Sequence, residues 1–246
     1  MTAFAVRGLT KRYASFLLDG VSFSLEEGRI MGFVGRNGAG KTTTLKSIFN
    51  LVHPDAGEIT AFGMDMKTHE REAKQQIGFA GGAADFYRRK KIKDIVNITK
   101  SFYENWDETE YRRYLTAFSL DENKTPRELS EGMRVKFSLM LSLSHHARLL
   151  LLDEPTSGLD PVSRAELLDT FRFLKSRGVS ILFSTHITTD VENCADDVAY
   201  IAKGKLVAAE PLTDFLARFA AAGAGNNLEE IMVYTEKERL YEAFAE

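Results

Sequence analysis

Short apolar runs predict a series of strands in the first third of the chain. Residues 4–7 and 21–25 alternate apolar and polar side chains, the period-two pattern of a strand with one buried face. Residues 29–34 are almost continuously apolar and run into a glycine-rich turn, which indicates a buried strand. The pattern further predicts a helix from about Lys41 to Leu51 and strands at 57–62 and 76–80.

The pattern changes to helical spacing between about residues 85 and 146. Aromatic, leucine and methionine side chains recur there every three or four residues, as on the buried face of a helix. They are Phe102, Trp106, Tyr111, Tyr114, Leu115 and Phe118, followed by Met133, Phe137, Met140 and Leu141. Such stripes usually form core rather than cofactor sites, so we expect a mostly helical insertion.

An α/β pattern resumes after the insertion. Residues 149–152 are four consecutive leucines, which indicates a central parallel strand buried on both faces. Asp160-Pro161 predicts a helix start, because Asp accepts free backbone N–H groups and Pro is tolerated in the first turn. Residues 179–184 predict a further buried strand, and residues 211–246 a largely helical extension.

Composition and charge narrow the class of protein. The 246 residues are 44% hydrophobic and 27% charged, as in an ordinary globular protein. A net charge of −3 does not favour nucleic acid as a partner, and the basic run at 88–93 is interpreted as a solvated surface segment. The single cysteine, Cys194, excludes an intrachain disulfide. No apolar run reaches the roughly 18 residues of a membrane span, and the N-terminus lacks a signal-peptide pattern.

The most specific motif is a phosphate-binding loop. It reads Gly35-Arg36-Asn37-Gly38-Ala39-Gly40-Lys41-Thr42 and matches G-x-x-x-x-G-K-S/T between an expected strand and an expected helix. The glycines let backbone N–H groups turn toward phosphate oxygens, and the helix N-terminus adds a partial positive charge. We expect Lys41 to neutralise the β and γ phosphates and Thr42 to bind Mg²⁺. By itself this motif leaves kinases, GTPases, helicases and transport ATPases open.

Two carboxylates follow the strand at 149–152. Asp153 and Glu154 stand at its C-terminal end, where ligand sites of open α/β sheets lie. Asp153 is expected to hold Mg²⁺, directly or through water, and Glu154 to deprotonate the attacking water, although either could instead cap the following turn. His186 follows the strand at 179–184 and is a candidate γ-phosphate contact, with a structural hydrogen-bonding role as the alternative.

Taken in order, these motifs resemble the ATP-binding subunits of ABC transporters over residues 1 to about 210. Tyr13 matches the aromatic residue that stacks on adenine, Gly35–Thr43 the Walker A loop, 129–133 the signature, Asp153 and Glu154 Walker B, 157–160 the D-loop, and His186 the switch histidine. The resemblance implies an α/β fold: a P-loop NTPase (RecA-like) core with an antiparallel β subdomain and a helical signature-motif insertion. The implied ATPase domain covers 1–210, with a helical subdomain at about 85–146 and an extension at 211–246.

The resemblance also implies partners. In this family the signature binds the ATP held by an opposite subunit. Ser130 and Gly132, which precede a helix expected to start near Met133, would therefore act in an ATP-bound sandwich dimer. The D-loop residue Asp160 would also contribute to that dimer. An ordinary serine cap is the alternative for Ser130. The dimer can be a homodimer or a heterodimer, and it would power an integral membrane transporter subunit from the cytoplasmic face of the cell membrane. The insertion is similar to bacterial export-type subunits.

Two departures from the family pattern keep alternatives open. The signature is usually Leu-Ser-Gly-Gly-Gln, but Glu131 and Met133 replace a Gly and the Gln; Glu131 is expected to face solvent or pair with Arg134. Gly82 stands where a Gln normally reaches Mg²⁺ and the attacking water. The alternatives are an ATP-dependent regulatory module with weak turnover and a soluble ABC ATPase outside transport. The second is disfavoured because the chain has one cassette and no long coiled coil.

Overall fold

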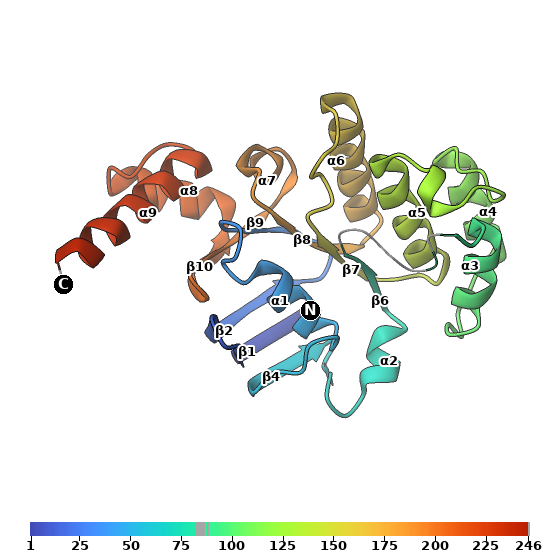
Figure 1. Ribbon diagram of the computed structural model, residues 1–246, viewed down its shortest axis with the longest axis horizontal. Helices are drawn as coiled ribbons and strands as arrows, with labels where there is room; N and C mark the ends of the chain where they lie inside the picture. The colour runs from blue at the N-terminus through green and yellow to red at the C-terminus, as the bar shows by residue number, and fades with distance from the viewer. Residues whose placement is uncertain (82–86, 88, 246) are drawn as a thin grey trace.

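Two β-sheets organise the molecule (Figure 1). The structure is a computed structural model that describes residues 1–81, 87 and 89–245, with side chains described as far as residue 237. The smaller sheet has the order β2-β1-β4-β5 and the larger sheet the order β10-β9-β3-β8-β7-β6. The smaller comprises β1 (Thr2–Arg12), β2 (Leu17–Glu26), β4 (Ala56–Ala61) and β5 (Met64–Asp65). The larger comprises β3 (Ile30–Val34), β6 (Ile77–Ala80), β7 (Leu149–Asp153), β8 (Ser180–Thr185), β9 (Asp197–Ala202) and β10 (Lys205–Pro211).

The larger sheet is parallel except at one edge. Parallel ladders join β6, β7, β8, β3 and β9, whereas β10 pairs with β9 antiparallel. All five residues of β7 are buried, and alternate leucines enter different cores: Leu149 and Leu151 pack with the small sheet, while Leu150 and Leu152 pack on the opposite face. The expected central strand is confirmed, and its continuous hydrophobicity reflects burial on both faces.

Different elements cover the two faces of this sheet. Helix α1 (Lys41–Ile48) and the small sheet cover one face, and α6 (Pro161–Ser176) and α7 (Thr188–Cys194) lie on the other (Figure 1). A short helix, α2 (Glu70–Lys74), precedes β6. Helix α1 ends three residues before the expected Leu51, because the chain reverses at Asn50 with φ 55°.

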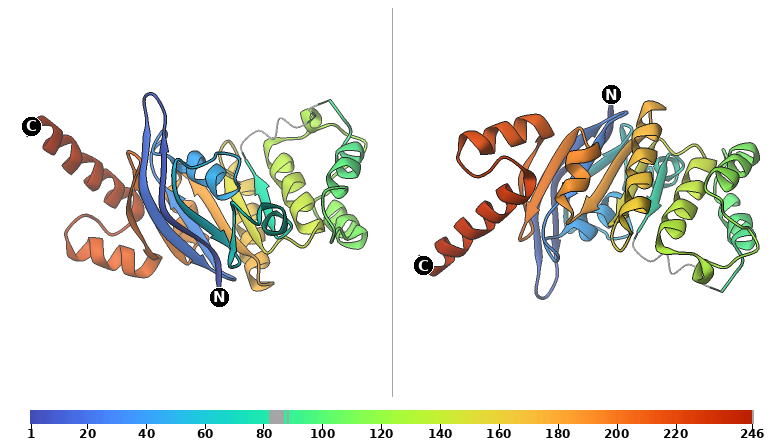
Figure 2. Two further views of the ribbon diagram at one scale, coloured as in Figure 1. Left: turned by 90° about the horizontal axis from the view of Figure 1, so that it is seen from below. Right: turned by 90° about the horizontal axis from the view of Figure 1, so that it is seen from above.

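The expected helical stretch forms a group at one end of the large sheet (Figures 1 and 2). It contains α3 (Ile92–Lys100), α4 (Glu108–Ala117), a 3₁₀ turn η1 (Pro126–Glu128) and α5 (Glu131–Ser144). Most of the predicted aromatic and methionine stripes form its core, in which Tyr111, Phe137 and Met140 are buried together. Phe102 is the exception: the pattern predicts it on the buried face, but it is 70% exposed. The limits of the predicted domains, 1–210 and 211–246, remain predictions.

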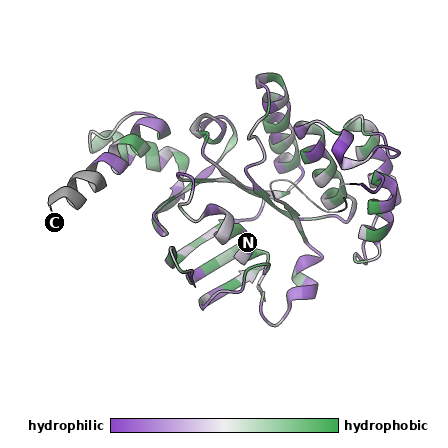
Figure 3. Ribbon diagram, in the orientation of Figure 1, coloured by the Kyte–Doolittle hydropathy of each residue, from purple (hydrophilic) through white to green (hydrophobic). Residues whose placement is uncertain are grey.

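The other strands expected from the pattern are also present: β1, β2, β3, β4, β6 and β8 cover the runs at 4–7, 21–25, 29–34, 57–62, 76–80 and 179–184. Strands β9 and β10 were not among the predicted elements. Figure 3 shows bands of apolar residues across the small sheet, and both apolar and polar residues on α5 and α6. None of the helices in the described part of the chain has the length and apolar character that a membrane crossing requires.

The C-terminal segment is docked rather than detached. It contains α8 (Leu212–Ala221) and α9 (Leu228–Ala245), at the opposite end of the large sheet from the helical group (Figure 2). Leu228 and Ile231 are fully buried in the core that contains Val191 of α7. Glu192 of α7 accepts a hydrogen bond from the Leu228 backbone N–H at 2.6 Å. The extension therefore begins as part of the fold.

Candidate active site

The phosphate-binding loop connects β3 to α1 at the carboxyl edge of the large sheet. Gly40 has φ 113°, and a side chain there would meet Phe16 and Leu18 at about 3 Å. A Cβ on Gly35 would lie 2.4 Å from the backbone oxygen of Ile201. These two positions therefore require glycine, one for its conformation and the other for close backbone approach. Between them, Gly38 also has a positive φ and Ala39 is buried.

Three predicted catalytic residues meet at this edge. Lys41 is 5% exposed, and its Nζ donates to the Gly35 carbonyl at 2.7 Å and pairs with Glu154 Oε1 at 3.1 Å. His186 Nδ1 lies 2.8 Å from Glu154 Oε2. They come from the start of α1 and the residues just after β7 and β8, so the parallel order of the strands brings them together. Glu154 is thus a carboxylate between a cation and an imidazole.

The two predicted metal ligands are neighbours. Thr42 Oγ1 donates to Asp153 Oδ1 at 3.1 Å, and Asp153 is largely buried. Oxygen donors of this kind suit Mg²⁺, which in nucleotide sites takes one or two protein ligands and completes its shell with phosphates and water. Within the described residues, no group of three or more His, Cys, Asp or Glu side chains is arranged to hold a metal ion by itself. The donor set therefore fits a metal that arrives with a nucleotide.

A cavity of about 570 Å³ lies over the loop and has the size of a small-molecule site. It is lined by Tyr13, Ser15, Phe16, Asn37, Gly38, Gly40, Lys41, Thr42, Thr43, Glu154, Ser157 and His186. Tyr13 is 44% exposed, with its ring centroid 6.4 Å from that of Phe16. Sequence reasoning missed Ser15 and Phe16, although Phe16 is only three residues from the expected aromatic; Ser157 is the first residue of the expected D-loop.

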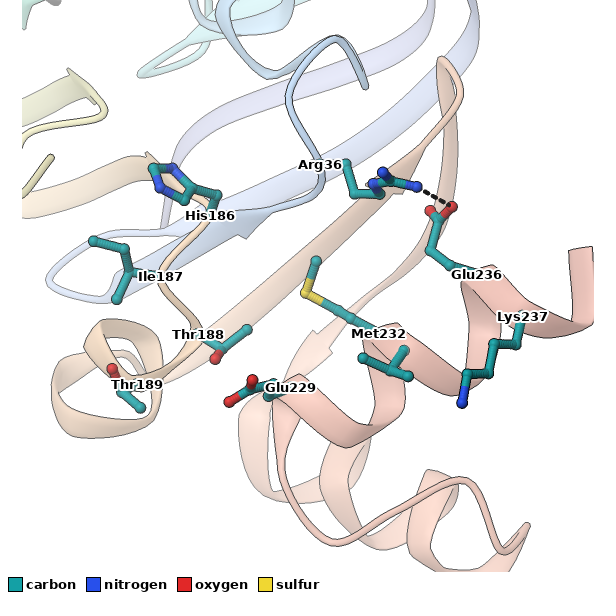
Figure 4. A pocket seen from close by; sticks show the side chains of 10 residues that line it. Arg36, His186, Ile187, Thr188, Thr189, Glu229, Met232, Glu236 and Lys237 are labelled. Atoms are coloured by element: carbon teal, nitrogen blue, oxygen red, sulfur yellow. Dashed lines mark ion pairs between the residues drawn. The ribbon is translucent and has the colours of Figure 1, made fainter. Parts of the chain in front are cut away.

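Arg36 lies apart from the rest of the loop. Its guanidinium points toward α9 and pairs with Glu236 at 3.6 Å (Figure 4). Together they border a second cavity of about 640 Å³ between the phosphate loop, α7 and α9. His186 lines both cavities. The first turns of α9 and His186 therefore face a common space, which the sequence did not predict.

The signature residues are not part of the cavity over the phosphate loop. Helix α5 begins at Glu131, two residues before the expected start near Met133, because Ser130 is its N-cap and accepts from the Met133 N–H at 3.3 Å. Gly132 faces the D-loop region: a Cβ there would lie 3.6 Å from Leu159. In the described chain, neither Ser130 nor Gly132 lines that cavity.

Asp160 also has a local role. It is the N-cap of α6, as expected, and its Oδ1 accepts from the N–H groups of Val162 and Ser163 at 3.0 Å. The Ser163 hydroxyl donates to Oδ2, and these hydrogen bonds lower the pKa of the Asp160 carboxyl. Like Ser130, it does not line the described cavity over the phosphate loop.

The two departures from the family pattern have different outcomes. Glu131 is exposed and forms an ion pair with Arg134, so the expected solvent-side pairing is confirmed. Gly82 lies outside the described residues. The basic residues of the run that the structure describes are Arg89, Lys90, Lys91 and Lys93, and all of them are exposed.

An apolar groove of about 350 Å³ separates the helical group from α1 and β6. Its lining includes Leu51, Phe79, Phe102, Tyr103 and Phe137. Leu51 is 52% exposed and Phe102 is 70% exposed, which is unusual for large apolar side chains on one surface.

Comparison with known proteins places these features in a family. The sequence profile described as "ABC transporter" matches residues 18–157, more than half of the chain. The chain is 34% identical over 191 residues to the ABC transporter ATP-binding protein YtrB of Bacillus subtilis (strain 168), covering 77% of this chain and 65% of that protein. It is 31% identical over 225 residues to the probable multidrug ABC transporter ATP-binding protein YbhF of Escherichia coli (strain K12), covering 89% of this chain and 39% of that protein.

A solved structure shows the same fold. It is described as "Structure of ATP binding subunit of ABC transporter" and superposes with a TM-score of 0.83 at 28% identity, covering 94% of this chain and 98% of the other. The P-loop NTPase fold predicted from the sequence is therefore confirmed. In sequence, the chain spans less than two thirds of the length of the two relatives above.

Proposed function

This chain belongs to the ABC transporter family of ATP-binding proteins, and we propose that it is the subunit that hydrolyses ATP to power a separate membrane subunit. The observation that carries the proposal is the meeting of Lys41, Glu154 and His186 beside the phosphate loop. Tyr13 would stack on the adenine, and the backbone N–H groups of the loop, together with the Lys41 and Thr42 side chains, would hold the phosphates.

The proposed reaction is in-line attack of water on the γ-phosphorus. Glu154 takes a proton from the water while the water oxygen forms a bond to the γ-phosphorus. The bond between the γ-phosphorus and the β–γ bridging oxygen breaks, which leaves ADP and phosphate. Lys41 and His186 stabilise charge on the γ-phosphate oxygens. Thr42 and Asp153 would hold Mg²⁺, which neutralises charge on the β and γ phosphates.

The position of the signature supports a shared site. Ser130 and Gly132 do not line the cavity over their own chain's phosphate loop, yet Ser130 offers a hydroxyl at a helix N-terminus, where an anion is favoured. Two chains facing each other, identical or different, would bring each signature over the other's nucleotide. The D-loop with Asp160 would lie between them. We therefore propose an ATP-bound sandwich dimer.

The apolar groove supports a membrane partner. Its exposed Leu51 and Phe102 would be covered by a short helix from the transporter subunit, by an apolar helix-in-groove contact. This arrangement would hold the chain at the cytoplasmic face of the cell membrane. Export is the proposed direction, in line with the multidrug transport named for YbhF.

The test is steady-state ATP hydrolysis by the purified chain. Glu154→Gln should reduce kcat by about 100-fold or more, because it removes the general base, while ATP binding persists. Glu58→Gln, an exposed glutamate on the small sheet, is the matched control and should hydrolyse ATP normally. No hydrolysis by the unmodified chain would contradict the motor and favour the alternative, a regulatory module with weak turnover.

A further inference from the structure

Ser184 is a buried polar residue that the proposed mechanism does not use. It occupies β8 between two apolar strands and pairs in register with Asp153 of β7, and its exposure is 0%. A hydroxyl at such a position is unfavourable unless both its donor and its acceptor are satisfied. The hydrogen-bond partners of the Ser184 hydroxyl therefore indicate its role.

Both partners of the Ser184 hydroxyl are proposed site residues. The hydroxyl donates to Asp153 Oδ1 at 2.6 Å and accepts from the Glu154 backbone N–H at 3.0 Å. Asp153 Oδ1 also accepts from Thr42 Oγ1 at 3.1 Å. One hydroxyl thus completes a chain of hydrogen bonds from the phosphate loop to the residue that carries the general base.

The backbone of Glu154 depends on this contact. Its φ is 51°, a left-handed conformation that residues with a Cβ rarely adopt. The Glu154 N–H is held by both the hydroxyl and the carbonyl oxygen of Ser184, the latter at 3.1 Å. This turn aims the Glu154 carboxylate at Lys41 and His186. A neighbouring hydroxyl that fixes the N–H therefore fixes the direction of the carboxylate.

We propose that Ser184 is a positioning residue for the metal-binding and water-activating carboxylates, Asp153 and Glu154. The proposal rests on the function proposed above. Ser184 does not line the described cavity over the phosphate loop; it orients Asp153 through a side-chain hydrogen bond and Glu154 through its backbone. Its loss would misdirect the carboxylates while leaving the phosphate loop and the adenine contact in place.

The test compares two substitutions of equal size. Ser184→Thr keeps the hydroxyl and Ser184→Val replaces it with a methyl group, so the pair separates hydrogen bonding from volume. Ser180→Ala is the control, because Ser180 is also buried on β8 but its hydroxyl accepts from the Gly28 N–H, away from the site. Ser184→Ala replaces the Val variant if the latter does not fold.

The expected result is a split between catalysis and binding. Relative to Thr, the Val variant should lose roughly 10-fold to 100-fold in kcat, while KM for ATP changes less than about twofold. In EDTA, the Val and Thr variants should bind a fluorescent ATP analogue with the same affinity. When Mg²⁺ is titrated in, the Val variant should need a several-fold higher Mg²⁺ concentration to reach half of the metal-dependent increase in affinity. Ser180→Ala should alter neither.

Two results would overturn the proposal. One is a Val variant with the kcat and Mg²⁺ requirement of the Thr variant. The other is a loss shared equally with Ser180→Ala, which would mean that any buried hydroxyl on β8 has the same effect. If the unmodified chain does not hydrolyse ATP, the proposed function fails by itself, and the Mg²⁺ requirement of analogue binding still decides the role of Ser184.

Discussion

Lys41 shows how single residues prepare the site. Its buried ammonium is satisfied by the Gly35 carbonyl and the Glu154 carboxylate, so it carries no unpaired buried charge. Phosphate oxygens would compete with Glu154 for this ammonium. Binding of a nucleotide would then release the carboxylate toward the attacking water, which couples occupation of the site to the availability of its base.

His145 supplies a residue-scale prediction about pH. Burial against Tyr103, whose ring stacks on it at 3.6 Å between centroids, lowers the pKa of His145 to about 4, and its Nδ1 lies 3.2 Å from the Gln75 carbonyl. In the unfolded chain the His145 imidazole has its ordinary pKa of about 6.5. Between pH 6.5 and 4 the unfolded state therefore binds more protons than the folded state. Stability is fully present above about pH 6.5 and decreases as the pH falls toward 4, by up to about 3 kcal/mol.

Urea unfolding at several pH values between 7 and 4.5 measures this effect. His145→Gln removes the titrating ring, so its free energy of unfolding should change less with pH than that of the unmodified chain. His53→Gln replaces an exposed histidine and should keep the original dependence. Equal slopes for the unmodified chain and His145→Gln would contradict the assignment.

At the scale of elements, the contact between α7 and α9 joins the C-terminal extension to the site. Helix α7 begins two residues after His186. The first residue of α9, Leu228, donates its backbone N–H to the carboxylate of Glu192 on α7. Further along α9, Glu236 reaches Arg36 of the phosphate loop. An element that the sequence left without a role is therefore attached at two points near the nucleotide cavity.

Cys194 lies at the end of α7, and the reactivity of its thiol can be used to measure how stably α9 packs on α7. Burial raises the pKa of its thiol to about 12, so at pH 8 only about one thiol in ten thousand is ionised. Because it is the only cysteine, labelling with Ellman's reagent follows a single site. We expect slow labelling in the folded chain, limited by opening of α9 or by unfolding.

Two substitutions in α9 test whether opening of this helix exposes the Cys194 thiol. Ile231→Ala removes a fully buried side chain, which typically costs about 2–5 kcal/mol, and should accelerate labelling at least tenfold. Val233→Ala, at a position that is 48% exposed on the same helix, should label like the unmodified chain. Fast labelling of the unmodified chain would show that α9 does not protect Cys194.

At the scale of the whole molecule, the prediction concerns assembly. Glu154→Gln should trap the ATP-bound dimer, because it blocks hydrolysis and retains the phosphate loop. Analytical ultracentrifugation should show a species of twice the 27.6 kDa chain with ATP and Mg²⁺, and a monomer without them. Adding Lys41→Ala to Glu154→Gln should abolish the dimer, because the ammonium that binds phosphate is lost. A Glu154→Gln chain that stays monomeric at saturating ATP would contradict the sandwich dimer as a homodimer.

Features that depend on neighbouring residues could be predicted from the amino-acid sequence alone. The phosphate loop needs glycine at Gly40, where φ is 113°, and burial on both faces of a sheet needs a continuously apolar strand such as 149–152. Both requirements fall on residues close together along the chain, so a short pattern records them. The elements of the core and the family could be predicted for that reason.

Contacts between residues far apart along the chain could be identified only in the folded molecule. Ser184 lies 30 positions from Glu154, and Arg36 is separated from Glu236 by most of the sequence. A serine in a strand or a glutamate in a helix has no distinctive pattern, because its meaning depends on strand order and helix docking. The order of β3, β8 and β7 brings the proposed catalytic groups to one edge, and packing of α9 on α7 places the C-terminal helix beside them.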